Sequence, residues 1–514
     1  MQKKFRKNYI KVYFWQGIAL VLNFISMFIV IPYLASKPNI YGIYTICISV
    51  SIFLAYADLG FIGVGQKYAA EYFAKKERTG EMKVIGFAVF ILIIFLVIFS
   101  VVFFILSLNP NLLVNNLESS SDKLVASYLL LIIAFSTPTT MFQRLAQSIY
   151  GIRIEEYIVH RFNIFANILK ILSVLWFFRT GHYNIVSYFL FIQIVNFFIS
   201  LMILVIAHKR YDYNFRELIK YVRFNKNIFL KTKSLAFSSL FLIFTWILYY
   251  ELDPTIIGKL LGANQVALYA IGLTILSFFR SIFNILYSPF NARFNHFIGL
   301  NDFIGLKNLY QQILIFLTPL VVFPIIAITI MAKPVIITWV GTEYVDSIKI
   351  AQLLILCNLL AFITYPTSIL LMAQEKIKEM YFVNTLLVLV FWGGILISFK
   401  YWDLHSFAIF KLIAFAISAI AYYSVMLKFL QVDIIYSLKM IIQPIILPIV
   451  FLVVTSFLFI DYLPQEKSRI NFLIVIFIIG LLLLGSIFIL YISSPIHRKK
   501  MRSIYISVIS KSIY

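Results

Sequence analysis

The stretch NFLIVIFIIGLLLLGSIFILYI, residues 471–492, is almost unbroken Leu, Ile, Val and Phe. It is long enough to cross a bilayer, because a membrane-spanning helix needs about 20 predominantly apolar residues. Thirteen similar apolar runs precede it, separated by polar breaks. The fourteen runs are 9–34, 40–65, 83–108, 124–150, 160–178, 184–207, 234–257, 265–290, 310–333, 348–373, 380–400, 405–428, 438–460 and 471–492. The pattern predicts an all-α integral membrane protein with about 14 transmembrane helices.

Composition excludes a soluble fold. Of the 514 residues, 62% are hydrophobic and 13% are charged, whereas soluble domains have roughly 45 to 50% and about 25%. Cys47 and Cys357 lie in separate apolar runs, which excludes a disulfide framework or a cysteine metal site. The basic start, residues 1–7, resembles the beginning of a signal peptide, but the apolar run after it is too long and has no cleavage site. We interpret it as an uncleaved first helix.

The distribution of basic residues predicts the orientation. If the N-terminus is cytoplasmic, 31 of the 44 Lys and Arg residues fall in inner segments, nine in outer segments and four within spans. This bias is a strong positive-inside signal. It predicts both termini in the cytoplasm and accounts for most of the net charge of +23 without nucleic acid as a partner.

Weak internal similarity predicts two lobes. At an offset of 225 positions Asn39 aligns with Asn264 and Tyr44 with Tyr269, and Pro138 aligns with Pro366 at an offset of 228. Such repeats are common in transporters. The predicted organisation is a six-helix lobe, a basic cytoplasmic linker, a second six-helix lobe around the same central cavity, and two lipid-facing helices with a basic tail. The corresponding ranges are 1–207, 208–233, 234–430 and 431–514.

Polar side chains recur every three or four residues in several spans. Such side chains are costly in hydrocarbon and usually face a cavity or another helix. The candidates for substrate binding are Lys170, Arg280, Arg144, Asn284, Asn167 and Gln143. For Lys170 and Arg280 the alternative is a buried structural ion pair. For Arg144 it is a side chain that reaches to the inner surface, and Lys411, the fourth base within a span, is interpreted as an interfacial anchor.

Two acids are candidates for coupling or gating. Asp58 lies near the inner end of the second span, where glycines at 60, 63 and 65 permit close packing or a local break. Its alternative is a pair with an inner-side cation. Asp253 precedes Pro254 near the outer end of the seventh span, and its alternative is to mark a break there. Glu155 and Glu156 are interpreted as solvated.

Three short motifs carry a family resemblance. They are Asp58 to Phe61, Asp253 to Gly258 with the following Leu261-Gly262 and Val266 to Tyr269, and Trp339 to Gly341 with Tyr344. In these motifs the chain resembles the polysaccharide and O-antigen flippases of the multidrug/oligosaccharidyl-lipid/polysaccharide exporter superfamily. The segment from Gln265 to Tyr269 departs from the family pattern, which often has Gly before the Tyr. The resemblance implies two lobes that rock between inward- and outward-facing states, with extra helices at the C-terminus.

The resemblance also implies a substrate and a location. The substrate would be an oligosaccharide on a polyprenyl diphosphate, flipped across a bacterial inner membrane for O-antigen, capsule or exopolysaccharide synthesis. Lys170, Arg280 and Arg144 suit an anionic diphosphate. Further partners would be anionic membrane lipid and the polysaccharide polymerase machinery. No organic cofactor or metal is implied, and coupling to protons or sodium is open.

Two other functions stay open at this stage. An ion-coupled multidrug extruder of the same fold would be expected to place acids deep in the cavity, where this chain has bases. A membrane glycosyltransferase or polymerase usually needs a sizeable outer domain, whereas the longest outer segments here are about 15 residues. No phosphate-binding loop of the P-loop type occurs, so ATP hydrolysis by such a loop is excluded.

Overall fold

The computed structural model describes residues 2–502 except 116, 118, 180, 181, 375, 432 and 500, and these residues form helices and no strand. Eleven of the helices are long and apolar enough to cross a membrane. The number rises to 13 if two bent helix pairs each count as one span. The protein is therefore an all-α, multi-pass membrane protein, and the total of fourteen spans stays a prediction.

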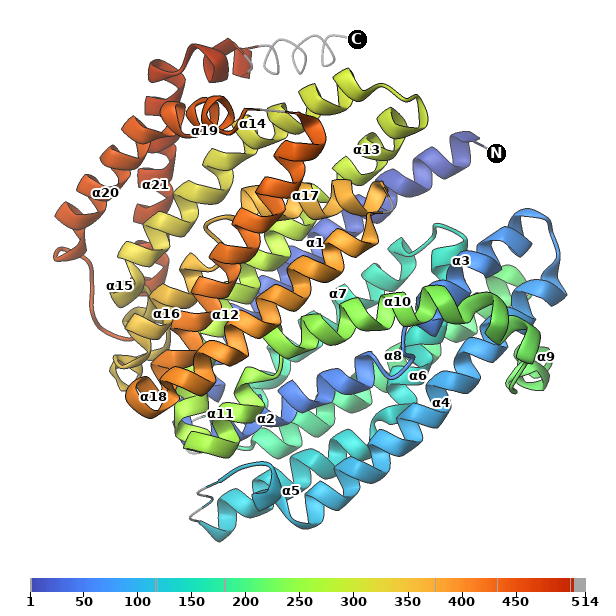
Figure 1. The fold of residues 1–514 in the computed structure, drawn as a ribbon. Coiled ribbons are helices and arrows are strands. Elements are labelled where there is room, and N and C mark those ends of the chain that lie inside the picture. The colour runs from blue at the N-terminus through green and yellow to red at the C-terminus, as the bar shows by residue number, and fades with distance from the viewer. Residues whose placement is uncertain are drawn as a thin grey trace. The chain divides into compact units, whose positions relative to one another are not determined.

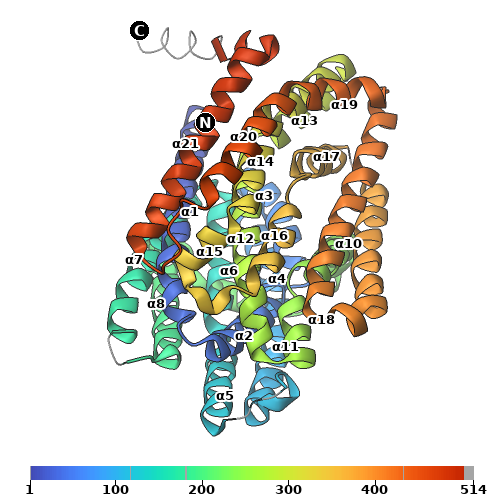
Figure 2. The ribbon, with the colours of Figure 1, turned by 90° about the vertical axis from the view of Figure 1, so that its left-hand side faces the viewer.

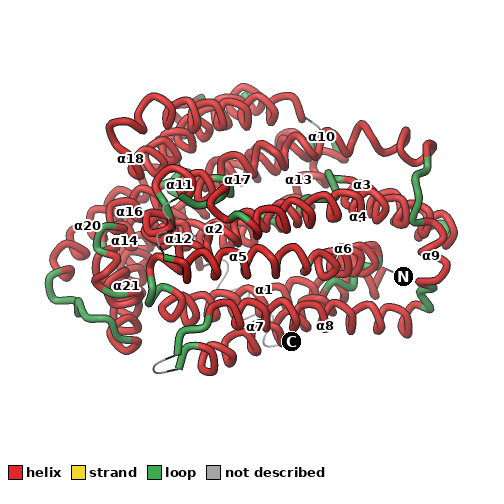
Figure 3. The backbone as a smooth tube through the Cα atoms, turned by 90° about the horizontal axis from the view of Figure 1, so that it is seen from below, coloured by secondary structure: helices red, strands yellow, loops and turns green. Residues whose placement is uncertain are grey.

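The helices pack as two units, residues 1–267 and 268–514 (Figure 1). Within the first unit, α1 packs along α7, and α4 contacts both α3 and α5 (Figure 3). The elements of this unit are α1 (Gln2–Leu34), α2 (Pro38–Ala55), α3 (Phe61–Ala74), α4 (Arg78–Leu108), η1 (Pro110–Leu112), α5 (Ser120–Phe135), α6 (Thr137–Ile152), α7 (Tyr157–Phe177), α8 (Ile185–Tyr211), α9 (Phe215–Tyr221), α10 (Lys226–Tyr250) and α11 (Asp253–Leu261). The unit boundary falls within the next helix, α12 (Ala263–Tyr287).

In the second unit α14 is central, because it contacts α16, α17, α20 and α21. The remaining elements of this unit are α13 (Pro289–Gly299), α14 (Phe303–Ile330), α15 (Ala332–Val340), η2 (Thr342–Tyr344), α16 (Ser347–Leu356), α17 (Ala361–Ala373), α18 (Ile377–Leu430), α19 (Ile434–Ile442), η3 (Gln443–Ile445), α20 (Ile446–Ile460) and α21 (Arg469–Ser493). Large apolar side chains such as Leu473, Phe477, Leu484 and Phe488 are exposed along α21. Such a surface suits hydrocarbon.

The element α18 is two helices in sequence. At about 1.5 Å per residue, a straight helix from Lys378 to Leu430 would be about 80 Å long, well over twice the hydrocarbon thickness. The backbone turns at Asp403, where φ is 39° and ψ is −120°. The two halves then run side by side (Figure 2), with the rings of Trp392 and Phe407 6.3 Å apart. This matches the two separate spans predicted at 380–400 and 405–428.

Several of the predicted spans are broken, among them the second, the fourth, the seventh and the tenth. The second ends at Ala55, because Leu59 and Gly60 have φ of 48° and 79°, in the left-handed region, before α3 begins. The fourth is the pair α5 and α6, bent by 42° just before Pro138, and the tenth is α16 and α17, bent by 44°. Proline lacks the N–H that would continue a helix. The predicted limits of the fourth and tenth spans lie within four residues of the helix ends, whereas α3 continues to Ala74, nine residues past the predicted end of the second span. The local break that the glycines at 60, 63 and 65 permit does occur, and the breaks in the fourth and tenth spans were not predicted.

The predicted repeat recurs in the spacing of the elements. The helices α2 and α12 begin 225 positions apart, as do α4 and α14, and α3 and α13 begin 228 positions apart. The bent pair α5 and α6 also corresponds in order to α16 and α17. The lobe boundaries at 207 and 234 stay a prediction. The first packing unit extends past them because α10 packs on α3 and α11 packs on α2.

His497 ties the segment after α21 to α14. Its ring is 2% exposed, and Nε2 lies 3.2 Å from the carbonyl oxygen of Ile315. Since a carbonyl only accepts, Nε2 carries the proton, and in the neutral ring Nδ1 accepts from the hydroxyl of Ser494 at 2.8 Å. Burial lowers the pKa of His497, and its contact with Ile315 opposes that shift. The fold therefore favours the neutral ring.

Candidate functional site

The first candidate pair, Asp58 and Arg144, lies at the break between α2 and α3. The Asp58 carboxylate is buried and accepts a hydrogen bond from the backbone N–H of Ile62 at 3.0 Å. Arg144, on α6, donates to the carbonyl of Ala55 and acts electrostatically on Asp58. The two side chains thus satisfy open backbone groups at facing helix ends. The pairing of Asp58 with an inner-side cation stays a prediction, and Arg144 is the cation whose charge acts on it.

The rest of the Asp58-to-Phe61 motif is a packing point for α10. A Cβ added to Gly60 would lie 3.0 Å from the carbonyl oxygen of Ala236 and 3.1 Å from Cβ of Ser239. Phe61 belongs to a buried cluster with Val64, Phe87 and Ala236. The absence of a side chain at position 60, and its positive φ, therefore let α10 pass close to the helix break.

Asp253 begins α11 and is fully buried. A carboxylate in the first turn of a helix is stabilised by the helix dipole. Further along, a Cβ on Gly258 would overlap the side chain of Ile46 on α2, and the Gly258 carbonyl accepts from the N–H of Asn115 at 3.1 Å. The span does break at Asp253, as its alternative interpretation predicted, and the motif docks α11 onto α2.

The third motif closes a turn in the second unit. Gly341 has a φ of 112°, which ends α15, and the ring of Trp339 stacks on that of Phe472 with centroids 6.3 Å apart. Tyr344 is fully buried. All three motifs therefore lie where the chain turns or where two helices approach closely.

Lys170 and Asn167 lie on a partly exposed polar stripe of α7, together with Asn163. At 3.6 residues per turn this stripe is about 180° around the helix from the exposed apolar stripe of Phe165 and Leu172. The stripe is therefore turned away from the lipid-facing side. Among the residues described, none makes a hydrogen bond, ion pair or ring contact with Lys170 Nζ.

The stripe of α7 has a polar counterpart on α1. The two helices run parallel. Arg161 of α7 contacts Trp15 of α1, 146 positions away, and Tyr183, just after α7, donates to the carbonyl of Leu34, 149 positions away. Asn23 is therefore level with Lys170. It is exposed and lies on the side of α1 opposite to the exposed Val21 and other apolar residues. An amide thus stands at the same depth as the lysine.

On α6, Gln143 is exposed one position before Arg144, and Gln147 accepts from Arg144 at 3.3 Å. In the second unit, Arg280 is half-buried on α12 and Asn284 is exposed one turn further along. The carbonyl of Arg280 accepts from the Tyr365 hydroxyl at 3.1 Å. The six binding candidates therefore lie on α6 and α7 in the first unit and on α12 in the second.

The prediction of an interfacial anchor is wrong for Lys411. Its side chain is 1% exposed, and Nζ lies 5.1 Å from the centroid of the Phe391 ring in the other half of α18. A cation over an aromatic face is stabilised by the ring's electrons. The hairpin turn at Asp403 brings the two residues together, which the position of Lys411 near a span end did not reveal.

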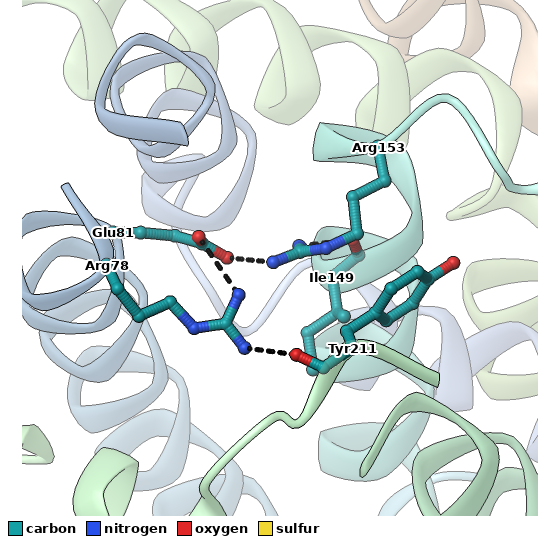
Figure 4. Close-up of polar contacts among 5 residues, drawn as sticks. All are labelled: Arg78, Glu81, Ile149, Arg153 and Tyr211. Carbon is teal, nitrogen blue, oxygen red and sulfur yellow. Dashed lines mark hydrogen bonds and ion pairs between the residues drawn. The ribbon is translucent and has the colours of Figure 1, made fainter. Parts of the chain in front are cut away.

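A buried ion cluster at the start of α4 and the ends of α6 and α8 was not predicted (Figure 4). Arg153 donates to the Glu81 carboxylate at 2.8 Å, and their side chains are 4% and 1% exposed. Arg78 lies 3.5 Å from the same carboxylate and donates to the carbonyl of Tyr211 at 3.2 Å. The guanidinium of Arg153 also lies 4.9 Å from the Tyr211 ring centroid. This cluster holds three helix ends together.

The interpretation of Glu155 as solvated is wrong. Its side chain is 6% exposed and lies 2.7 Å from Arg210, and it accepts from the Tyr211 hydroxyl at 2.8 Å. Glu156 is half-buried, and burial raises its pKa. Glu155 and Glu156 lie at the end of a span, and charges at span ends are usually interpreted as solvated residues outside the membrane. Opposite charges at the ends of several spans were the only signal that could have revealed the pairing.

Comparisons with known proteins bear on the fold. No protein-family model and no curated protein sequence matches the chain. Among solved structures, an inward-facing multidrug resistance MATE family transporter of the MOP superfamily matches with a TM-score of 0.64, at 11% identity, over 79% of this chain and 94% of its own. The lipid II flippase MurJ, in an inward closed conformation, matches with a TM-score of 0.64, at 16% identity, over 94% and 98%. A MOP superfamily transporter from Pyrococcus furiosus, described as having a binding pocket of reversed polarity, matches with a TM-score of 0.56, at 13% identity, over 84% and 97%.

At these identities the likeness concerns the fold. The chain has the fold shared by MATE transporters and MurJ. Among the described residues no group of three or more His, Cys, Asp or Glu is placed to hold a metal ion.

Proposed function

We propose that this protein flips a polyprenyl-diphosphate-linked oligosaccharide from the cytoplasmic to the outer leaflet of a bacterial inner membrane, for surface polysaccharide synthesis. Transport would proceed by alternating access between two lobes, residues 1–207 and 234–430, with both termini in the cytoplasm. The observation that carries the proposal is the position of Lys170 on the non-lipid side of α7, with no acidic partner among the described residues.

A lone ammonium in a membrane span needs a reason to be there. Translocon insertion puts the cost of a lysine at a helix centre at about 2.5 to 3.5 kcal/mol. Lys170 is 13 residues, or about 20 Å, along α7 from Tyr157. A transient anionic ligand would offset its cost, and a diphosphate accepts charge-assisted hydrogen bonds from lysine and arginine. Arg280 supplies a second cation for the same role on α12 of the second unit.

The amides near these cations suit the other part of the substrate. Asn167 and Asn23 accompany Lys170, and Asn284 accompanies Arg280. Amides both donate and accept hydrogen bonds, as sugar hydroxyls require. Gln143 would extend such a surface on α6. Arg144, whose guanidinium is bound at the α2 end, would contribute mainly charge.

The extent of the structural matches gives independent support. The lipid II flippase covers 94% of this chain and the first MATE structure 79%. The other MATE structures cover 83%. The greater coverage by a flippase of a lipid-linked molecule favours a lipid-linked substrate over a small solute. Polysaccharide polymerase machinery and anionic lipid are the partners that this function implies.

A second candidate is an ion-coupled multidrug extruder, because MATE transporters share the fold. The observation that favours it is the full burial of Asp253. An acid that takes up and releases a proton or binds sodium would couple transport to an ion gradient. Asp58 suits that role less, since its carboxylate already accepts from Ile62 and faces Arg144. A glycosyltransferase or polymerase has no feature of the structure in its favour.

The deciding experiment reconstitutes the purified protein in vesicles with a fluorescent lipid-linked oligosaccharide on the inner leaflet. We expect wild-type protein to move it outward, Lys170→Met to slow flipping at least tenfold, and Lys170→Arg to retain most of the rate. Lys400→Met, which removes an exposed lysine, is the matched control and should have no effect. Wild-type flipping by well-folded Lys170→Met would refute the role of Lys170. Extrusion of lipophilic cations, lost in Asp253→Asn, with no glycolipid movement would establish the extruder.

A further inference from the structure

An apolar pocket of about 480 Å³ lies in the first unit, between α4, α6, α8 and the short helix α9. Its walls include Val89 of α4, Leu145 of α6 and Leu201 of α8. His208 is the only side chain in the lining that is not apolar. The volume is within the range of ligand sites, about 300 to 1,000 Å³. An open pocket with such walls suits a hydrocarbon ligand.

The helix α9 closes one side of the pocket with an amphipathic face. Phe215, Leu218, Ile219 and Val222 all line the pocket. Their spacing of i, i+3, i+4 and i+7 places them on one side of a helix. A Cβ on Gly86 of α4 would overlap the backbone of the last residue of α9, so α9 lies directly against α4 (Figure 3). The apolar face of α9 is therefore held over the pocket by close packing.

Cations surround this entrance. Arg216 and Lys220 are exposed and lie on the flank of α9 beside its apolar face, and the exposed Arg223 follows just after the helix end. Lys209, at the end of α8, is exposed too. No ion pair joins any of these four to an acid within the described part of the chain. Arg210 differs, because it is paired with Glu155 at 2.7 Å. Four cations around the pocket are thus available to an anionic group.

The pocket has the depth of one leaflet. It extends along α8 from His208, near the helix end, to Leu201. Seven residues of helix correspond to about 10 Å, within the roughly 15 Å of hydrocarbon in half a bilayer. The positive-inside distribution places this end of α8 at the cytoplasmic surface. The apolar walls therefore reach into the inner leaflet and the cations lie at its headgroups.

We propose that this pocket binds an acyl chain of an anionic phospholipid from the cytoplasmic leaflet, whose phosphate is held by the cations of α9 and Lys209. An amphipathic helix with a basic flank is the general solution for holding an anionic lipid surface. The bound lipid would fix α9, the segment that leads into α10. The site is separate from the stripes of Lys170 and Arg280, and it does not depend on the proposed transport function.

The test uses the full-length protein in vesicles that contain 5% phosphatidylglycerol or phosphatidylcholine with a photoreactive group on one acyl chain. Cross-linked peptides are mapped by mass spectrometry. We expect phosphatidylglycerol to label the 201–222 region at least fivefold more than phosphatidylcholine. Two variants should each remove most of that label: Lys220→Gln/Arg223→Gln, which removes charge, and Ile219→Trp, which fills the mouth of the pocket. Ile219 is 68% exposed, so the tryptophan has room without unfolding the helix.

The matched control is Lys378→Gln/Lys428→Gln, which removes two exposed lysines from the second unit. It should leave the label unchanged. Equal labelling by the two lipids, or labelling that survives Ile219→Trp, would overturn the proposal. Competition with unlabelled lipids identifies the source: displacement by polyprenyl phosphate but not by phosphatidylglycerol would assign the pocket to the tail of a transported lipid and would likewise overturn it.

Discussion

Replacing Glu81 by Leu should destabilise the first unit strongly. The replacement leaves the guanidinium of Arg153 4% exposed with no carboxylate at 2.8 Å. Removing one partner of a buried ion pair typically costs about 3 to 5 kcal/mol. Arg78 contributes less to this cost, because it is 33% exposed and can be solvated. For a unit of this size, about 2 to 4 °C per kcal/mol gives a loss of roughly 6 to 20 °C in the unfolding temperature.

Each unit holds one buried cysteine, which provides the assay. Cys47 is 1% exposed in the first unit and Cys357 is 5% exposed in the second. In a Cys357→Ala background, a thiol-reactive fluorescent dye would report the unfolding of the first unit alone as detergent-solubilised protein is heated. Glu71→Leu, which removes an exposed acid of the same unit, is the matched control and should change stability by no more than about 0.5 kcal/mol.

The double variant Glu81→Leu/Arg153→Met tests the reasoning. Replacement of both partners of a buried ion pair by apolar residues is often nearly neutral. The double variant should therefore recover most of the loss seen in Glu81→Leu. A shift below 2 °C in the single variant, or a double variant no more stable than the single one, would show that the cluster does not carry the cost assigned to it.

Three further predictions concern packing, pH and the two kinds of intramembrane cation. Gly42→Ala should lower the free energy of unfolding by about 1 to 3 kcal/mol, because its Cβ would overlap the backbone at the start of α12. Gly63 has open space around it, so Gly63→Ala should be neutral or slightly stabilising in the same dye assay. Burial lowers the pKa of His497, so the unfolded chain takes up a proton before the folded one does. Stability should therefore fall as the pH drops below about 6.5. The fall should be smaller in His497→Gln, and an equal fall in that variant would contradict this origin. Lys170→Met should slow flipping and leave stability unchanged or raise it. Arg144→Met should lower stability, because it removes a hydrogen-bond donor to the end of α2. A lower unfolding temperature for Lys170→Met than for Arg144→Met would refute this difference between the two cations.

Apolar periodicity predicted the class of fold and the limits of most spans, because the bilayer imposes one length on every crossing helix. The interior breaks were harder to predict. Pro138 and Gly60 are visible in the sequence, but a proline or glycine in a span is tolerated wherever neighbouring groups satisfy the backbone. At this break the Asp58 carboxylate satisfies the N–H of Ile62 in the same segment, and Arg144 on another helix satisfies the carbonyl of Ala55. A contact 89 positions away has no local signature.

Stripes of polar residues could be predicted because they follow the periodicity of the helix. Asn167 and Lys170 follow the helical repeat, and their side of α7 can be derived from the apolar residues opposite. The pairing of Glu81 with Arg153 could not be derived, since it depends on which helix ends meet. In the sequence, neither Glu81 nor Arg153 can be distinguished from the other charged residues near span ends. Burial of Lys411 depended likewise on the turn at Asp403.

Substitutions in the three motifs and in the polar stripes should therefore affect the protein in different ways. Asp58, Gly60 and Gly258 are fixed by contacts within the first unit, so a substitution at any of them would disturb packing before it disturbed a substrate. A loss of transport in such a variant would result either from disturbed packing or from a lost substrate contact. Lys170 makes no such contact within the described part of the chain, and its charge is costly in a protein that only needs to fold. A change in transport at Lys170 with unchanged stability is for this reason the observation that would connect this chain to an anionic substrate.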